Sequence, residues 1–235
     1  MADRNTLRLA ATLVVIGAVF YEVVSFFHVG GANNDAAAFR ALGNSSIWTA
    51  VHFGQFFGSA LITAGVLALS FALNLTGGMP MLVNRIGAAA LVASLALSGV
   101  VYAVDGVALK QAADAWLRAP AAEKTARFAS AETIRWLEWG VRSYSSYTFG
   151  LGLVLVAIAI VWTARISRPI GYLIGLNGLA NFALGWFTGS EGFSSTTGIA
   201  FSVVAFSLAA WMIWLLIVAW RMKETAPAAS PASSS

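Results

Sequence analysis

Cysteine is absent from this chain of 235 residues, and histidine occurs only twice. The lack of cysteine excludes disulfides, thiolate metal sites and cysteine nucleophiles, and it leaves the redox compartment undetermined. Two histidines are too few for the three-histidine zinc site of an intramembrane hydrolase. The sequence also contains no phosphate-binding loop and no dinucleotide fingerprint. Composition and motifs therefore leave the question of an enzymatic activity open, and they assign no metal and no cofactor.

Charged residues are also scarce, at 10% of the chain, against about 25% in an ordinary soluble domain. Hydrophobic residues make up 59%, and the mean hydropathy is +0.77. Several apolar runs approach the ~20 residues that a helix needs to cross a bilayer. The sequence therefore predicts an all-α, polytopic membrane protein whose partner is the lipid bilayer. The net charge of +4 does not indicate a nucleic-acid partner, because the basic residues are few and scattered.

Six transmembrane helices are expected, covering about residues 9–28, 47–73, 86–107, 131–162, 170–187 and 198–220. The first helix is predicted to be a retained anchor rather than a cleaved signal peptide, because its apolar part is long and contains Glu22. Residues 1–224 then form one transmembrane domain. The tail at 225–235, TAPAASPASSS, is low in complexity and is expected to be disordered in the cytoplasm.

The basic residues predict the orientation of the chain. An even number of spans places both termini on one side, and that side carries the short basic loops at Arg85 and at 165–168. Basic residues in short loops mark the cytoplasmic side of a membrane protein. Both termini are therefore expected in the cytoplasm.

Two hydrophilic segments are expected on the other, outer side. The first, between the first two spans, is rich in glycine and asparagine and is interpreted as a loop. The second, QAADAWLRAPAAEKTARFAS, places Trp116 and Leu117 among charged residues. Such an amphipathic pattern predicts a segment lying on the membrane surface.

The fourth span begins with a polar stripe. Arg135, Glu138, Arg142 and Ser145 follow one another at spacings of three and four residues, so they share one face of a helix. Charged residues inside a membrane are costly, and they indicate either a functional site or an internal ion pair. Both interpretations stay open here.

The ionisable residues of the spans all fall in the outer half of the predicted bundle. Amides on the second and fifth spans add to them. This distribution favours a pocket open to the outside, or a polar contact at the outer rim, over the midplane site of a transporter. The candidate ligand-binding residues are Glu22, His28, His52, Gln55, Asp105, Arg135, Glu138, Arg142, Asn177 and Asn181.

Glu22 is the deepest acid of the chain, so we predict that it pairs with Arg142, directly or through His52 or a water molecule. In the alternative, Glu138 satisfies Arg142 within its own helix. Glu22 would then hydrogen-bond to Gln55 or Asn181. The residue pairs Gly54/Gly58 and Gly171/Gly175 are interpreted as notches that let helices approach closely.

Two segments resemble a broad group of uncharacterised bacterial six-helix membrane proteins, a domain of unknown function. WTAVHFGQFFGSALITAGVLAL, with Trp48 and His52 in a W-x-x-x-H pattern, is similar to the second span of that group. SRPIGYLIGLNGLANFALGW is similar to the stretch after its fourth span. The resemblance implies a six-helix fold in the bacterial inner membrane, and it implies no activity and no catalytic residue.

The function expected from these patterns is the binding of a lipid, a small ligand or a membrane partner protein through the outer polar pocket. One alternative is a membrane enzyme that uses His52 with Glu22 or Glu138 as acid and base. The other is a single-haem electron carrier ligated by His28 and His52, and the two histidines could also share a metal ion.

Overall fold

The computed structural model describes residues 2–29 and 34–222, and these residues form helices and short connections without a strand. Six helical segments in this part of the chain are long and apolar enough to cross a membrane, as predicted. The tail at 225–235 lies outside the described residues. The helices are α1 (Arg4–Ser25), α2 (Asp35–Asn44), α3 (Trp48–Ala72), α4 (Gly78–Ala103), the π-helix η1 (Val104–Leu109), α5 (Lys110–Arg118), the 3₁₀ turn η2 (Ala121–Glu123), α6 (Lys124–Thr163), α7 (Arg168–Glu191) and α8 (Ser195–Arg221).

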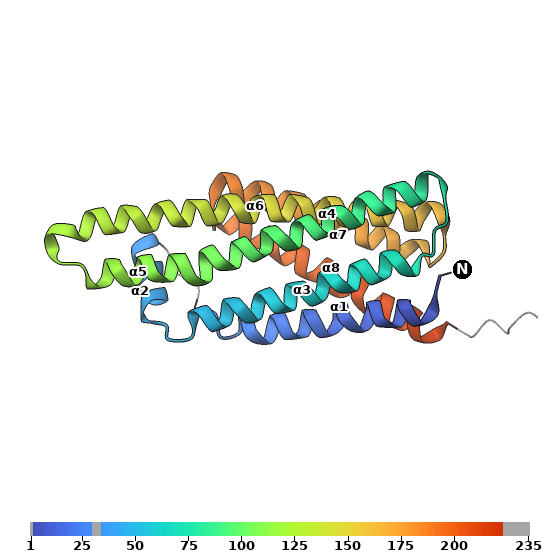
Figure 1. The fold of residues 1–235 in the computed structure, drawn as a ribbon, viewed down its shortest axis with the longest axis horizontal. Coiled ribbons are helices and arrows are strands. Elements are labelled where there is room, and N and C mark those ends of the chain that lie inside the picture. Colours follow the sequence, from blue (N-terminus) through green and yellow to red (C-terminus); the bar gives the residue numbers. More distant parts are fainter. Residues whose placement is uncertain (1, 30–33, 223–235) are drawn as a thin grey trace, which may run out of the picture.

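The long helices form one elongated bundle (Figure 1). Helix α1 packs on α3, α4 packs on α6, and α6 packs on α7, while α8 lies against α7 and α1. The first described residues and the end of α8 lie at the same end of the bundle, which we call the terminal end (Figure 1). The hairpin formed by α5 and the start of α6 projects from the opposite end, which we call the hairpin end (Figure 1).

The hydrophilic stretch between the third and fourth spans is not a segment lying on the membrane. The third helical segment runs without a break from Gly78 to Arg118, and α6 already begins at Lys124. Trp116 is buried because its ring packs against Phe39 and Phe128, at centroid distances of 6.2 Å and 5.4 Å. The apolar side chains that indicated a membrane surface therefore face other helices of the same chain.

The loop expected between the first two spans contains the helix α2. Asn34 caps it, because its side chain accepts a hydrogen bond of 2.9 Å from the backbone N–H of Ala37. Phe39 and Leu42 are buried against α5 and α6. Burial of these two side chains stabilises a short helix that its sequence alone leaves marginal.

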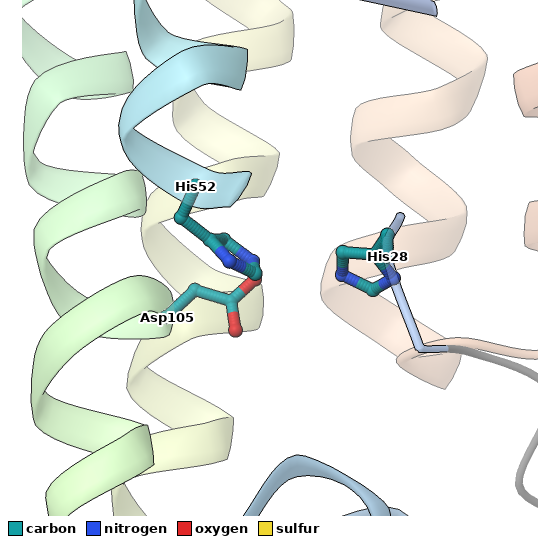
Figure 2. A group of neighbouring side chains, drawn as sticks. All are labelled: His28, His52 and Asp105. Carbon is teal, nitrogen blue, oxygen red and sulfur yellow. The ribbon is translucent and has the colours of Figure 1, made fainter. Parts of the chain in front are cut away.

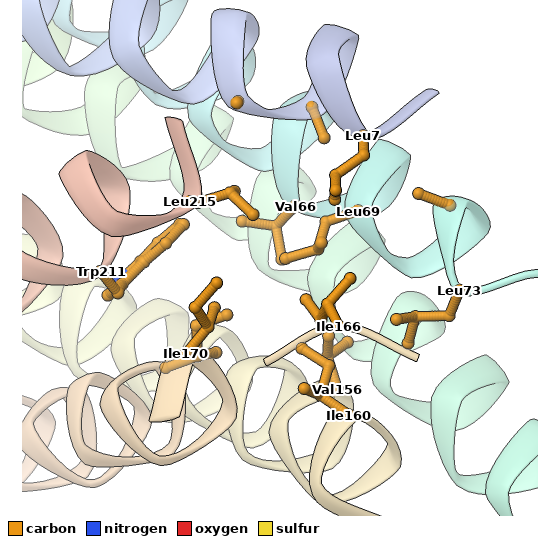
Figure 3. Packing of buried hydrophobic residues seen from close by; sticks show 14 of the residues in the cluster. Leu7, Val66, Leu69, Leu73, Val156, Ile160, Ile166, Ile170, Trp211 and Leu215 are labelled. Carbon is orange, nitrogen blue, oxygen red and sulfur yellow. The ribbon is translucent and has the colours of Figure 1, made fainter. Parts of the chain in front are cut away.

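Two apolar cores lie at different levels of the bundle. The larger core occupies the terminal end, where all the long helices contribute to it. Figure 3 shows part of it, including Leu7, Val66, Leu69, Leu73, Val156, Ile160, Ile166, Ile170, Trp211 and Leu215. The smaller core lies at the hairpin end, around Phe39, Leu109 and Trp116. The polar side chains described below lie between these two cores.

Close helix crossings depend on glycine, but the glycines involved are only partly the predicted ones. A Cβ on Gly58 would lie 3.0 Å from the carbonyl oxygen of Gly17, and a Cβ on Gly171 would lie 2.8 Å from the side chain of Val161. A Cβ on Gly175 would meet nothing closer than 3.4 Å, which is an ordinary contact. Gly175 is therefore not a tight packing notch.

Cysteine-accessibility labelling tests the orientation. Ser190 is exposed near the hairpin end of α7, and Thr76 is exposed in the loop between α3 and α4 at the terminal end. We expect a membrane-impermeant maleimide to label Ser190→Cys in intact cells and to label Thr76→Cys only after permeabilisation. The chain has no native cysteine to interfere. The reverse labelling pattern would show that the termini face outward.

Candidate functional site

Arg142 on α6 holds two acidic side chains together. Its Nη2 lies 2.8 Å from Oε1 of Glu138, one turn earlier on the same helix, and 3.0 Å from Oδ2 of Asp105. Its Nε donates a second hydrogen bond to Glu138, at 3.1 Å. Glu138 is fully buried and Asp105 is 5% exposed. Arg142 thus neutralises part of the charge of two carboxylates that water does not reach.

His52 and His28 also lie near Asp105 (Figure 2). Oδ2 of Asp105 is 2.9 Å from Nε2 of His52. One ligand atom from each of the three side chains can be chosen so that all three lie within 4.8 Å of one another. His28 follows α1, His52 belongs to α3 and Asp105 belongs to η1. Three segments that are distant in the sequence thus bring two imidazoles and a carboxylate together.

The π-helix η1 sets the position of Asp105. A π-turn breaks the regular pattern of backbone hydrogen bonds, so its carbonyl groups need other donors. The indole Nε1 of Trp48 donates to the carbonyl oxygen of Asp105 at 2.9 Å, and the hydroxyl of Thr49 donates to that of Gly106 at 2.7 Å. The first turn of α3 therefore fastens η1 beside His52.

Gly106 permits this contact. A Cβ at residue 106 would lie 2.5 Å from Cβ of His52, a distance that real Cβ atoms do not show. The ring of His52 is also fixed at its other edge, where Nδ1 donates a hydrogen bond of 2.9 Å to the carbonyl oxygen of Trp48. Because a carbonyl oxygen cannot donate, the proton of His52 resides on Nδ1 in the neutral ring.

His28 lies outside the membrane-spanning helices and is partly buried. Burial and, to a smaller extent, the neighbouring His52 lower its pKa from 6.5 to about 4. Its ring packs against those of Trp48 and His52, at centroid distances of 4.7 Å and 5.1 Å. The imidazole of His28 is therefore neutral at neutral pH, with a lone pair available on one nitrogen.

Arg135 does not join this cluster, although it shares a helical face with Glu138 and Arg142. Its Nε lies 3.3 Å from Oδ1 of Asp35 on α2. Its guanidinium also lies over the rings of Phe39, Trp139 and Phe193, at distances of 5.3–5.9 Å. Arg135 therefore connects α6 to the short helix α2.

A cavity of about 410 Å³ lies between the six spanning helices and meets the cluster at Arg142. Glu22, Asn177 and Asn181 also line it, together with several hydroxyl groups. These hydroxyls belong to Tyr21, Ser59, Thr63, Ser94, Ser98, Tyr102, Ser145, Ser146, Thr188, Ser194 and Thr197. The candidate residues therefore form two adjoining sets, one around Asp105 and one around the cavity.

The predicted ion pair between Glu22 and Arg142 is not formed. Both side chains line the cavity, but the ion pairs of Arg142 are made with Asp105 and Glu138. The alternative pairing within α6 is thus the one observed, with Asp105 as an additional partner. The sequence places Asp105 at the same depth as Arg142, but it does not predict the ion pair between them.

The amides differ from the prediction in detail. Gln55 donates to the hydroxyl of Ser25 at 3.0 Å and not to Glu22. Asn177 bonds across to α8, through the carbonyl oxygen of Val204 and the hydroxyl of Ser207. Asn181 instead donates to the carbonyl oxygen of Asn177 within α7. Gln55 and Asn177 therefore bond between helices, whereas Asn181 bonds within its own helix.

Several lining residues were missed, although a sequence signal existed for some of them. Ser94, Ser98 and Tyr102 recur every four residues and so share one face of α4. The hydroxyl of Ser98 lies 2.9 Å from that of Ser145, and the hydroxyl of Tyr102 lies 3.1 Å from that of Ser59. A stripe of hydroxyl groups along an apolar helix is the sequence pattern that indicates this wall of the cavity.

No protein-family model, curated protein or solved structure matches this chain. The resemblance to the bacterial six-helix group therefore stays an expectation, and function has to be argued from the site alone.

Proposed function

We propose that this protein binds a small, uncharged amphiphile in the cavity between its six spanning helices. The observation that carries the proposal is a cavity of about 410 Å³ with a guanidinium at one wall. This volume lies within the range of about 300–1,000 Å³ that small-molecule sites occupy. We also propose that the chain lies in the bacterial cytoplasmic membrane with both termini in the cytoplasm, which the basic loops at the terminal end support.

The hydrogen-bonding capacity of the walls supports a ligand with a polar end. Arg142 uses Nε and Nη2 for its carboxylate partners, and Nη1 makes no hydrogen bond to a described residue. The hydroxyl of Thr188, which lines the same cavity, is buried without a hydrogen-bond partner. An alcohol, ester or carbonyl oxygen would satisfy Nη1, because a guanidinium only donates.

The charges around the cavity favour an uncharged ligand. Arg142 already faces two carboxylates, and Glu22 adds another at the cavity wall, where it forms no ion pair with a described residue. An anionic headgroup would be repelled by these three acids. The apolar part of the ligand would lie against lining residues such as Ile62, Val101, Phe149, Leu184 and Leu208.

The two alternatives have weaker support. The expected acid–base pairs of His52 with Glu22 or Glu138 are replaced by a contact with Asp105, and neither His52 nor Asp105 lines the cavity. Axial haem ligation needs two imidazoles on opposite faces of a flat slot. His28 and His52 instead approach one point together with a carboxylate.

Filling part of the cavity should weaken binding. Gly198 lines the cavity and a Cβ there would meet no atom within 4 Å, so Gly198→Leu can direct added bulk into the cavity without a clash at its Cβ. In nanodiscs, 1-dodecanol is expected to raise the melting temperature of the wild-type protein, and dodecanoate much less. We expect Gly198→Leu to weaken 1-dodecanol binding by at least ~10-fold, as the loss of a hydrophobic subsite would.

The matched control is Gly140→Leu. Residue 140 lies on α6 outside the cavity, and a Cβ there also meets nothing within 4 Å. Both variants gain the same helix propensity, so they differ only in cavity volume. Equal binding of 1-dodecanol by Gly198→Leu and Gly140→Leu would contradict the proposed site, and native mass spectrometry of the purified protein would identify the natural ligand.

A further inference from the structure

We infer that His28, His52 and Asp105 form a binding site for one divalent first-row transition-metal ion, such as Zn²⁺. This site is separate from the cavity, since none of the three residues lines it. Two imidazoles and a carboxylate, each offering one ligand atom within 4.8 Å of the others, supply a donor set that suits such ions (Figure 2).

The nitrogen of His52 that faces Asp105 lacks a donor or acceptor partner. With its proton on Nδ1, the neutral ring presents a lone pair at Nε2. Nε2 is buried and forms no hydrogen bond with a described residue, even though Oδ2 of Asp105 is 2.9 Å away. Oδ2 therefore lies away from the axis that a hydrogen bond from Nε2 would need. Two electron-rich atoms at this distance repel each other, and either a metal ion or a proton beside Nε2 would remove this repulsion.

The distances fit a single ion. Two atoms bound to one ion at about 2.1 Å each lie about 3.0 Å apart at a right angle and about 3.4 Å apart at the tetrahedral angle of Zn²⁺ sites. The separation of 2.9 Å between Nε2 and Oδ2 is close to the first value and about 0.5 Å short of the second. At the tetrahedral angle the ligand atoms lie about 3.4 Å apart, so the limit of 4.8 Å requires His28 to approach by at most about 1.4 Å. His28 follows the end of α1 and is not held by a helix.

Surrounding groups orient these ligands as metal sites require. The carbonyl oxygen of Trp48 holds Nδ1 of His52, which is the usual way to fix the tautomer of a ligating histidine. Arg142 holds Oδ2 of Asp105 at 3.0 Å, while Oδ1 makes no hydrogen bond to a described residue. A carboxylate oxygen has two lone pairs, so Oδ2 can bind an ion beside Nε2 of His52 and keep its contact with Arg142.

The local charge also suits a divalent cation. Asp105 and Glu138 face a single arginine. Oε2 of Glu138 is buried without a hydrogen-bond partner. An ion at the site would offset the uncompensated negative charge in a region of low dielectric constant. A proton on Nε2 of His52 would compete with the metal ion for this position.

Metal binding to the full-length protein tests this inference. The protein is purified in detergent without a histidine tag, stripped with a chelator and titrated with Zn²⁺ against a chromophoric chelator. We expect one equivalent of Zn²⁺ to bind. His28→Ala and His52→Ala should each weaken binding by at least ~100-fold, and Asp105→Asn by at least ~10-fold, since loss of supporting groups alone costs 10–100-fold. Gln55→Ala is the control, because Gln55 bonds to Ser25 and not to the ligands.

Two further readouts keep the test decisive. Zn²⁺ should raise the melting temperature of the wild-type protein but not that of His28→Ala, a substitution outside the helices that leaves the bundle intact. ¹⁵N-histidine NMR should show Nε2 of His52 unprotonated and shifted by Zn²⁺. Absence of saturable binding, binding unchanged in both histidine variants, or a doubly protonated His52 that Zn²⁺ does not alter would overturn the inference.

Discussion

Replacing Arg142 by methionine is expected to destabilise the bundle by about 3–5 kcal/mol, the usual cost of removing one partner from a buried ion pair. Glu138 is fully buried and Asp105 nearly so, and Arg142 is the cation that both contact. In thermal unfolding, a loss of this size corresponds to a fall of about 10 °C for a chain of this length. The loss arises from two carboxylates left in a low-dielectric interior, because methionine keeps the packing of the arginine stem.

A second ion pair, between η2 and the start of α6, provides the control. Arg127 lies 3.1 Å from Glu123 at the same four-residue spacing, but both side chains are about half exposed. Arg127→Met should cost no more than about 1 kcal/mol, because water screens an exposed pair. Arg142→Met combined with Glu138→Gln should recover part of the lost stability. Equal effects of Arg142→Met and Arg127→Met would show that water reaches the cluster around Asp105.

Gly178→Ala is expected to destabilise the contact between α6 and α7. A Cβ at residue 178 would lie 2.8 Å from the carbonyl oxygen of Gly150 and 3.0 Å from the backbone nitrogen of Val154. Since backbone atoms cannot rotate away, the helices must separate, and overpacking of this kind costs about 1–3 kcal/mol. The measurement is thermal unfolding in detergent.

Gly175→Ala, one turn earlier on α7, is the matched control. The nearest atom to its added Cβ is Cβ of Ala157, 3.4 Å away, which is an ordinary van der Waals contact. Alanine also has a higher helix propensity than glycine by up to about 1 kcal/mol. Gly175→Ala should therefore leave the stability unchanged or raise it. A loss of stability as large as that of Gly178→Ala would contradict the view that helix propensity and the distance between crossing helices decide the effect of these substitutions.

The metal inference and the ligand proposal depend on different atoms of one polar region. The ion would lie among His28, His52 and Asp105, whereas the amphiphile would contact the other side of Arg142. Gly198→Leu addresses only the cavity and His28→Ala addresses only the metal site. Each proposal can therefore fail without the other.

Local composition was enough to predict the six spanning helices and the half of the bundle that holds the polar residues. Hydropathy is a sum over neighbouring residues, and it indicates whether a stretch of the chain can lie in lipid rather than in water. The depth of a residue follows from its count along a helix, at 1.5 Å per residue. The sequence therefore placed His52, Asp105, Glu138 and Arg142 at one level of the bundle without the structure.

Tertiary structure alone decided which of these residues meet. Depth gives no information on the direction in which a side chain points around the bundle, and Glu22 was assigned to Arg142 for this reason. The π-turn at Val104–Leu109 changes that direction within one helix, and it exists because Trp48 and Thr49 of another helix bond to its carbonyl groups. Gly178 packs against Gly150 from a distant part of the chain. Such contacts depend on how whole helices cross, which no window of neighbouring residues contains.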